Sequence, residues 1–261
     1  IIKMKYLKKK NNLKKMVEDG FLMLNKKLIV VTGSSGRFGV ALQNSKIKIK
    51  FKKLFPTKKQ LNILDVNSIY NYLNKKKPKY VLHLAGLSRP MSVHDTNIEK
   101  SINLNIIGTA NMVVCCSKLN IKLIYFSTSY VYDNKNRTSS ENDPVFPKNN
   151  YAWSKLGGES AVQMYKNSLI LRVSMTEKPF VHKKAFKNVI TNFMYHDDVI
   201  KILSKILEEK GVLNIGGKTQ SVYNFVKKDN PKVKGAKAKK NQIPFNSAMN
   251  ISKLKKIINE F

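Results

Sequence analysis

Short apolar runs alternate with longer amphipathic segments along most of the chain. Runs that are continuous, rich in β-branched residues and ended by turn residues predict strands buried on both faces of a sheet. Such runs cover residues 27–32, 80–84, 123–127, 168–173 and 212–215. Ile47, Ile49 and Phe51 alternate with lysines and predict one further strand after the first.

Segments with helical periodicity lie between these runs. They cover residues 38–44, 67–74, 98–119, 151–166 and 199–209. Strands that alternate with helices predict an α/β fold with a doubly wound parallel sheet. The polar, proline-containing residues 134–150 predict a loop, and the periodicity of residues 218–250 is too weak to assign elements.

A glycine-rich turn follows the first predicted strand directly. Gly33, Gly36 and Gly39 give it the spacing G-x-x-G-x-x-G. The first glycine permits the tight turn, the second lets the backbone approach a pyrophosphate, and the third lets the helix pack on the strand. The N-terminus of the following helix adds free N–H groups and a partial positive charge, so a dinucleotide site is predicted. Its predicted contact residues are Gly33, Ser35, Gly36, Arg37, Phe38 and Gly39.

The second strand lacks the acidic residue that usually binds the ribose 2′-hydroxyl of NAD. Between Ser45 and Gln60 the only charged side chains are lysines, and Lys52, Lys53, Lys58 or Lys59 could meet a 2′-phosphate. This favours NADPH as the cofactor, with NADH as the alternative. The competing interpretation is that these lysines follow the general composition of the chain.

That composition is strongly basic, with a formal net charge of +33. Such a charge raises nucleic acid or an anionic membrane as a partner. The excess is nearly all lysine and is spread along the chain, whereas direct base contacts favour arginine. A composition bias is therefore favoured, and no specific nucleic-acid partner is predicted. No apolar run approaches the ~20 residues of a membrane span.

The cysteines, the histidines and the N-terminal segment limit the remaining possibilities. Cys115 and Cys116 are adjacent in a predicted helix, point roughly 100° apart and make a poor disulfide, which fits a reducing cytoplasm. No metal-ligand spacing is found, and His83, inside an apolar strand, is interpreted as a core histidine. Residues 1–25 form a basic tail that need not be native, and they lack the pattern of a signal peptide.

Tyr151 and Lys155 form a Y-x-x-x-K motif at helical spacing, so they share one helix face. A lysine ammonium there is expected to lower the pKa of the tyrosine phenol from its free value of ~10. The phenol could then exchange a proton with a carbonyl or alcohol near neutral pH. Thr128 and Ser129 end the preceding strand, where a hydroxyl can orient the substrate oxygen.

Together these motifs resemble the extended short-chain dehydrogenase/reductase family, and most of all dTDP-4-dehydrorhamnose reductases and related sugar-nucleotide reductases and epimerases. The resemblance runs from about residue 27 to about residue 258. Besides the glycine turn and the Y-x-x-x-K motif, the matching pieces are QLNILD (60–65), HLAG (83–86), NIIGT (105–109), STSYVY (127–132), Gly158-Glu159, Leu171-Arg172 and GVLNIGG (211–217).

This resemblance implies a Rossmann-type domain over residues 26–175 and a small C-terminal substrate-binding lobe over 176–261, with about 196–217 returning to the sheet. Thr128 would orient the substrate carbonyl, Tyr151 would donate the proton and Lys155 would bind the nicotinamide ribose. The further cofactor residues implied are Asn62, Ile63, Ala85, Gly86 and Asn105. The substrate residues implied are Ser88, Arg89, Thr128 and Ser129.

The implied function is NADPH-dependent reduction of a nucleotide-linked 4-keto-6-deoxy sugar, for deoxy-sugar and surface polysaccharide biosynthesis. The alternatives are an NAD-dependent epimerase or dehydratase, and a non-catalytic NAD(P)-binding regulatory subunit. Asn62 and Ser129 replace aspartates that the reductases usually carry, which leaves the exact substrate open. Members of the family often form homodimers through the helices that here carry Asn105 and Tyr151.

Overall fold

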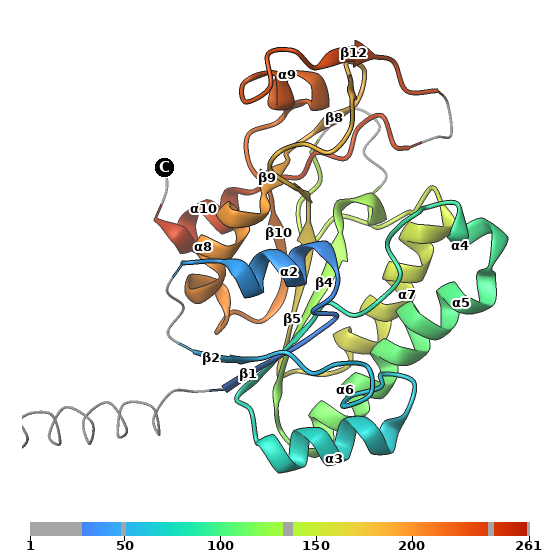
Figure 1. The fold of residues 1–261 in the computed structure, drawn as a ribbon, viewed down its shortest axis with the longest axis vertical. Coiled ribbons are helices and arrows are strands. Elements are labelled where there is room, and N and C mark those ends of the chain that lie inside the picture. The colour runs from blue at the N-terminus through green and yellow to red at the C-terminus, as the bar shows by residue number, and fades with distance from the viewer. Residues whose placement is uncertain (1–27, 48–50, 133–137, 240–242, 260–261) are drawn as a thin grey trace, which may run out of the picture.

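The computed structural model describes residues 28–47, 51–132, 138–239 and 243–259. Within these ranges the chain forms a six-stranded parallel sheet with helices on both faces (Figure 1), as the alternating pattern predicts. Across the sheet the strands are β10 (Gly211–Ile215), β5 (Ser168–Val173), β4 (Lys122–Thr128), β3 (Tyr80–His83), β1 (Leu28–Thr32) and β2 (Lys52–Leu54).

The strand order reverses at β1. From β1 the chain crosses to β2 on one side and then to β3 on the other, and all neighbouring strands are parallel. In such a sheet, ligands bind outside the carboxyl ends of the strands at the reversal point. The glycine turn after β1 and the ends of β3 and β4 all meet at this edge, which positions the candidate site.

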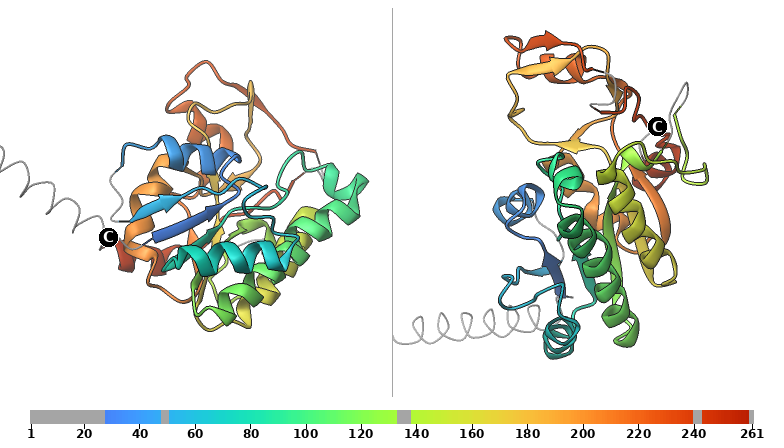
Figure 2. Two further views of the ribbon diagram at one scale, coloured as in Figure 1. Left: turned by 60° about the horizontal axis from the view of Figure 1, so that its bottom comes forward. Right: turned by 90° about the vertical axis from the view of Figure 1, so that its right-hand side faces the viewer.

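Two layers of helix cover the sheet and bury its apolar side chains (Figures 1 and 2). One face packs against α2 (Arg37–Asn44), α8 (His196–Ile206) and α10 (Ser252–Ile258). The other face packs against α3 (Val66–Lys76), α6 (Gly108–Lys118) and α7 (Asn150–Gln163). Burial on both faces explains why the central strands are continuous apolar runs.

The long helix predicted over residues 98–119 is interrupted. It consists of α5 (Ile98–Ile102), a π-helical turn η1 (Asn103–Ile107) and then α6. Asn105 lies in the π turn, and its side chain reaches back to the loop after β3. π turns inside α-helices frequently mark functional positions. The sequence does not predict this turn, because its apolar residues keep the spacing of an ordinary α-helix.

The second strand lies later than the alternation of residues 47–51 predicts. The strand is Lys52–Leu54, and Ile49 falls outside the described residues. Ile47 and Phe51 pack at the margin of the core without pairing in the sheet. The alternating pattern therefore predicted correctly that Ile47 and Phe51 contact the core, but it placed the strand too early in the sequence.

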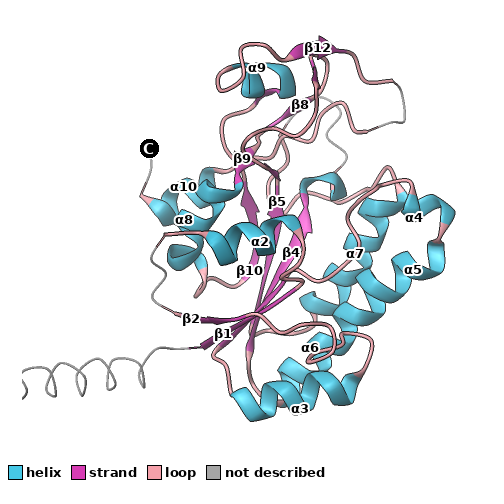
Figure 3. Ribbon diagram, viewed as in Figure 1, coloured by secondary structure: helices cyan, strands magenta, loops and turns pink. Residues whose placement is uncertain are grey.

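A small lobe stands at the carboxyl end of the sheet (Figures 2 and 3). It contains three two-stranded pairings and a core of its own that includes Val189, Val222 and Val226, while Met175 and Met194 of one pairing pack against the core of the large sheet. Its elements are β6 (Met175–Thr176), β7 (Lys184–Phe186), β8 (Ile190–Thr191), β9 (Met194–Tyr195), β11 (Gln220–Ser221), α9 (Val222–Lys227) and β12 (Lys234–Ala236). Two shorter helices, α4 (Val93–Thr96) and the 3-10 turn η2 (Ser129–Val131), border the same edge.

None of the helices in the described part of the chain combines the length and the hydropathy that crossing a bilayer requires. Cys115 and Cys116 are both buried and free.

Candidate active site

A pocket of about 560 Å³ opens at the carboxyl edge of the sheet. This volume lies within the roughly 300–1,000 Å³ typical of ligand sites. The structure brings most of the predicted site residues together around it. Those that line it are Gly33, Ser35, Gly36, Arg37, Phe38, Gly39, Ala85, Gly86, Ser88, Arg89, Thr128, Ser129, Tyr151 and Lys155.

The glycine turn forms one wall of this pocket and cannot carry side chains at two of its glycines. Gly33 has a φ of +69°, and a Cβ there would lie 2.5 Å from the backbone nitrogen of Ala85. A Cβ on Gly39 would lie 2.6 Å from the carbonyl oxygen of Gly33. Helix α2 begins after Gly36 with no side-chain cap and no acidic residue in its first turn. Its amino end can therefore accept an anion such as a phosphate.

Tyr151 and Lys155 enter the pocket from the first two turns of α7. The side chain of Asn149 caps this helix by accepting a hydrogen bond from the backbone N–H of Ala152 at 2.8 Å. Thr128, the last residue of β4, lines the same pocket, and its hydroxyl favours the ionised form of the Tyr151 phenol. A phenol, an ammonium and a hydroxyl thus face one cavity, as proton transfer to a substrate oxygen requires.

Burial raises the pKa of Tyr151, whereas the sequence motif predicts a lowered value. The hydroxyl of Thr128 and the positive charge of the Arg89 guanidinium both lower the pKa of Tyr151, but the effect of burial is larger. The lysine ammonium expected to do this is directed elsewhere, because Lys155 Nζ lies 4.2 Å from the ring centroid of Tyr125. Burial lowers the pKa of Lys155 to about 7, against the opposing charge of Glu159.

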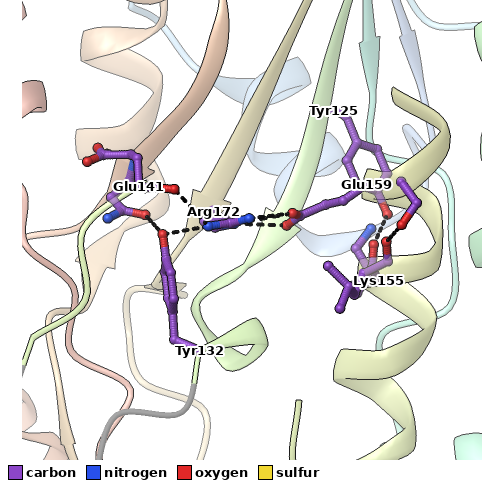
Figure 4. A network of polar contacts seen from close by, with 9 residues as sticks. Tyr125, Tyr132, Glu141, Lys155, Glu159 and Arg172 are labelled. Atoms are coloured by element: carbon purple, nitrogen blue, oxygen red, sulfur yellow. Dashed lines mark hydrogen bonds and ion pairs between the residues drawn. The ribbon is translucent and has the colours of Figure 1, made fainter. Parts of the chain in front are cut away.

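A buried polar network holds α7 against the sheet behind these groups (Figure 4). The Arg172 guanidinium donates to the Glu159 carboxylate, with Nη2 2.8 Å from Oε2, and both side chains are less than a tenth exposed. Arg172 Nη1 also donates to the Tyr132 hydroxyl at 2.7 Å. The Tyr125 hydroxyl donates to the carbonyl oxygen of Lys155 at 3.2 Å. These bonds fix the turn of α7 that carries Lys155.

Asn105 lies behind the pocket wall and is not among the residues that line it. Its Oδ1 accepts from the backbone N–H of Leu87 at 2.6 Å, and its Nδ2 donates to the Leu87 carbonyl at 2.9 Å and to the Ser154 hydroxyl at 2.8 Å. It therefore joins the loop after β3 to α7. A Cβ on Gly86 would lie 2.7 Å from Asn105 Oδ1, so this close approach needs glycine.

His83 is the satisfied core histidine that the sequence indicates. Its Nδ1 lies 2.8 Å from the Thr32 hydroxyl and its Nε2 lies 3.2 Å from the Thr109 hydroxyl. The Thr32 oxygen also accepts from the backbone N–H of Ala85 at 3.2 Å. Burial lowers the pKa of His83 to about 3, so the ring is neutral and connects β1, β3 and α6 below the pocket.

Three other predicted cofactor residues lie outside the pocket lining. Lys58 is exposed, and Ile63 is buried in the core on the side of α3 and α6. Asn62 Oδ1 accepts from the backbone N–H of Leu64 at 3.2 Å, within its own turn. Lys53, another lysine considered for a 2′-phosphate, donates instead to the carbonyl of Leu42 at the end of α2.

Several residues that line the pocket were not predicted from the sequence. Tyr130, Glu177 and His196 bring a phenol, a carboxylate and an imidazole, and Met91 and Phe193 add apolar surface. Tyr130 was within reach of sequence reasoning, because it stands two residues after Thr128 at the end of β4. Glu177 and His196 follow two-residue strands of the lobe, which are too short to show a period.

His94 lies next to the pocket on α4. Its ring centroid is 5.2 Å from that of Tyr151, and its Nδ1 is 2.7 Å from the Ser101 hydroxyl. The Asp95 carboxylate accepts from Asn150 Nδ2 at 2.9 Å, so α4 is attached to the first turn of α7 next to Tyr151. The described residues contain no cluster of histidine, cysteine and acidic side chains able to hold a metal ion.

Comparison with known proteins finds relatives that are similar in sequence to about half of this chain. Methionine adenosyltransferase 2 subunit beta of Pongo abelii is 30% identical over 155 residues, which are 57% of this chain and 46% of that protein. Spore coat polysaccharide biosynthesis protein SpsK of Bacillus subtilis (strain 168) is 27% identical over 148 residues, 56% of this chain and 52% of that protein. The chain spans about half the length of the curated relatives it matches.

Among solved structures, dTDP-4-dehydrorhamnose reductase from Bacillus anthracis in complex with NADP superimposes with a TM-score of 0.79. The match covers 90% of this chain and 94% of that one at 20% identity, so it shows a shared fold. The family model of the RmlD substrate binding domain matches residues 26–205, which is more than half of the chain. The protein therefore belongs to the RmlD substrate binding domain family.

Proposed function

We propose that this protein is an NADPH-dependent reductase of a nucleotide-linked 4-keto-6-deoxy sugar. The observation that carries the proposal is that Thr128, Tyr151 and Lys155 share one pocket with the glycine turn after β1. A proton donor and a dinucleotide-binding turn on the same cavity are what carbonyl reduction requires. The family and the fold both agree with this assignment.

The residues present fit a nicotinamide dinucleotide. The uncapped start of α2 and the glycine turn would hold its pyrophosphate, and Lys155 would hold the ribose next to the nicotinamide. The buried hydroxyl of Ser127, in the pocket lining, has no hydrogen-bond partner within the described chain and so can bond a polar ligand group. When bound, the cofactor would supply a hydride.

The protein side of the reaction is the supply and orientation of a proton. Tyr151 would donate it to the oxygen of the reduced carbonyl, and Thr128 would hold that oxygen in place. Ser88, Arg89 and Ser129 would contact the substrate from the rim of the pocket. NADPH as the cofactor is supported by the NADP-bound structure that shares this fold and by the absence of an acidic residue directly after β2. Lys53 and Lys58 add no support, because neither lines the pocket.

The proposal extends to the pathway, the cellular compartment and the oligomeric state of the protein. A relative named for spore coat polysaccharide biosynthesis supports a role in deoxy-sugar and surface polysaccharide synthesis. Buried free cysteines fit the reducing cytoplasm. A homodimer would form through η1, α6 and α7, where Ile107, Val114 and Trp153 are each more than 40% exposed.

The function is tested by purifying the protein and identifying any bound dinucleotide by mass spectrometry. The purified protein is then mixed with NADPH and a dTDP-4-keto-6-deoxy sugar, and the loss of NADPH absorbance is followed. We expect exchangeable NADPH and substrate-dependent oxidation. NAD that stays bound through purification, without net NADPH consumption, would favour the epimerase or dehydratase.

A second candidate is a non-catalytic NAD(P)-binding subunit. The relative at 30% identity is named as a subunit of methionine adenosyltransferase, which is a specific observation in its favour. This candidate predicts dinucleotide binding without turnover of any keto sugar. The assembled set of Thr128, Tyr151 and Lys155 favours the reductase, because a binding subunit does not need a proton donor.

A further inference from the structure

An ion pair crosses the pocket from the glycine turn to the lobe. Arg37 is the first residue of α2 and Glu177 directly follows β6, and Arg37 Nη1 donates to Glu177 Oε1. Both residues line the pocket. The arginine side chain is 52% exposed and the glutamate side chain only 17%, so the arginine can turn away more easily.

Charge in the pocket is otherwise positive. Among the described residues that line it, Arg37, Arg89 and Lys155 are the cations and Glu177 is the one carboxylate. A dinucleotide brings at least two negative charges on its pyrophosphate. Arginine binds phosphate through two parallel hydrogen bonds, in the same way as it binds a carboxylate. Glu177 occupies Nη1 of Arg37, so a phosphate that binds end-on through both Nη atoms has to displace the carboxylate.

We propose that Glu177 sets the affinity for the dinucleotide by competing with its phosphate groups for Arg37. This inference rests on the proposed function only in that the pocket binds a dinucleotide. When a phosphate takes the guanidinium, the Glu177 carboxylate keeps a positive neighbour. Glu177 Oε2 still accepts a hydrogen bond from the Thr176 hydroxyl at 3.2 Å, and the charge of Arg89 also favours the ionised carboxylate, so Glu177 keeps favourable partners after the exchange.

The geometry also connects the lobe to the cofactor. Glu177 follows Thr176 of β6, and Thr176 pairs with Tyr195 of β9. His196, which follows Tyr195, lines the same pocket as Glu177. Release of Glu177 from Arg37 frees its carboxylate on the lobe side, where it can accept hydrogen bonds from sugar hydroxyl groups. Cofactor binding would thereby prepare the lobe for the substrate.

The test measures NADPH affinity by fluorescence titration for the full chain and its variants. Glu177→Gln should tighten binding roughly 2- to 5-fold, the size expected for removing a partly exposed ion pair. Arg37→Gln should weaken binding. In the Arg37→Gln background, Glu177→Gln should have no further effect, because the competition no longer exists.

A matched control removes a lobe carboxylate that does not line the pocket. Asp229 pairs with Lys178 at 2.6 Å and accepts from the Tyr195 hydroxyl at 2.8 Å. Asp229→Asn should leave NADPH affinity unchanged. Titration with NADH shows which phosphate competes with Glu177. If Glu177→Gln binds both NADPH and NADH more tightly, the competitor is the pyrophosphate, and if it binds only NADPH more tightly, the competitor is the 2′-phosphate.

Unchanged or weaker binding by Glu177→Gln would overturn the inference while leaving the proposed function intact. A gain that persists in the Arg37→Gln background would also overturn it, because the carboxylate would then act only through its general charge. If the parent protein binds neither dinucleotide, the proposed function and the inference both fail.

Discussion

The phenol of Tyr151 is the group on which the proposed chemistry depends most directly. Tyr151→Phe keeps the ring and removes the proton, so turnover should fall by roughly 10²–10⁴-fold. NADPH affinity should change little, because Lys155 remains to hold the ribose. The comparison uses NADPH consumption for turnover and fluorescence titration for affinity. Turnover by Tyr151→Phe at the parent rate would show that another group supplies the proton.

Lys155 and Thr128 should behave differently from Tyr151 and from each other. Lys155→Met should damage both NADPH affinity and turnover, because the ribose contact and the local charge are lost together. Thr128→Val should lower turnover chiefly, through lost orientation of the carbonyl. The three losses should not add in double variants, because members of one catalytic unit fail together. Additive losses would show that the residues act independently.

Lys155 also predicts a dependence of stability on pH. In the folded protein its pKa is lowered to about 7, against an ordinary value of about 10.4 in the unfolded chain. Between these values the unfolded chain binds more protons, so this group makes the free energy of unfolding rise with pH from about 7 to about 10. Lys155→Met should flatten that rise. Urea denaturation at several pH values, without added cofactor, measures it, and equal slopes in parent and variant would contradict the assignment.

At the scale of elements, the Glu159–Arg172 pair joins α7 to β5 within the core. Glu159→Leu leaves a buried guanidinium without its partner and should lower the free energy of unfolding by about 3–5 kcal/mol. Adding Arg172→Met should recover part of that loss, since the lone charge is then gone. Urea denaturation measures both effects.

An exposed ion pair provides the control for this prediction. Lys201 Nζ lies 2.8 Å from Asp198 Oδ1 on α8, and both side chains are more than 40% exposed. Asp198→Asn should change the free energy of unfolding by less than about 1 kcal/mol. If Glu159→Leu destabilises the protein no more than Asp198→Asn does, the buried network does not anchor α7 as we propose.

Elements with a strong local signal could be predicted from the sequence, and elements defined by tertiary contacts could not. The strands around Val30, Val81 and Ile170 are buried on both faces, so their apolar runs reveal them. β2 pairs through backbone atoms over only three residues, and nearby apolar residues pack on the core without pairing. The π turn at Asn105 arises from bonds to a loop distant in sequence.

The same distinction applies to the candidate site. The glycine turn and the tyrosine–lysine pair are local in sequence, and the sequence predicts both, together with the pocket they line. Glu177 and His196 reach that pocket only because the lobe folds over the sheet, and no periodicity marks their two-residue strands. Lys58 is the opposite case, because the sequence predicts a contact with the cofactor and the side chain does not line the pocket.

For the whole molecule, the net charge of +33 is the property most open to misinterpretation. If it reflects composition, binding to DNA of unrelated sequence should be weak and should vanish at physiological salt through counterion competition. Filter binding or anisotropy across a salt series measures this. Sequence-selective binding that survives at physiological salt would establish nucleic acid as a partner.

The central claim, that the pocket transfers a hydride from NADPH to a sugar carbonyl, has one direct measurement. NADPH carrying deuterium at C4 of the nicotinamide, on either face, is incubated with the protein and a dTDP-4-keto-6-deoxy sugar, and the sugar product is analysed by mass spectrometry. We predict a product with one deuterium at the former keto carbon from one of the two labelled faces, and almost none with Tyr151→Phe. A product without deuterium from either face, or no product at all, would contradict the account.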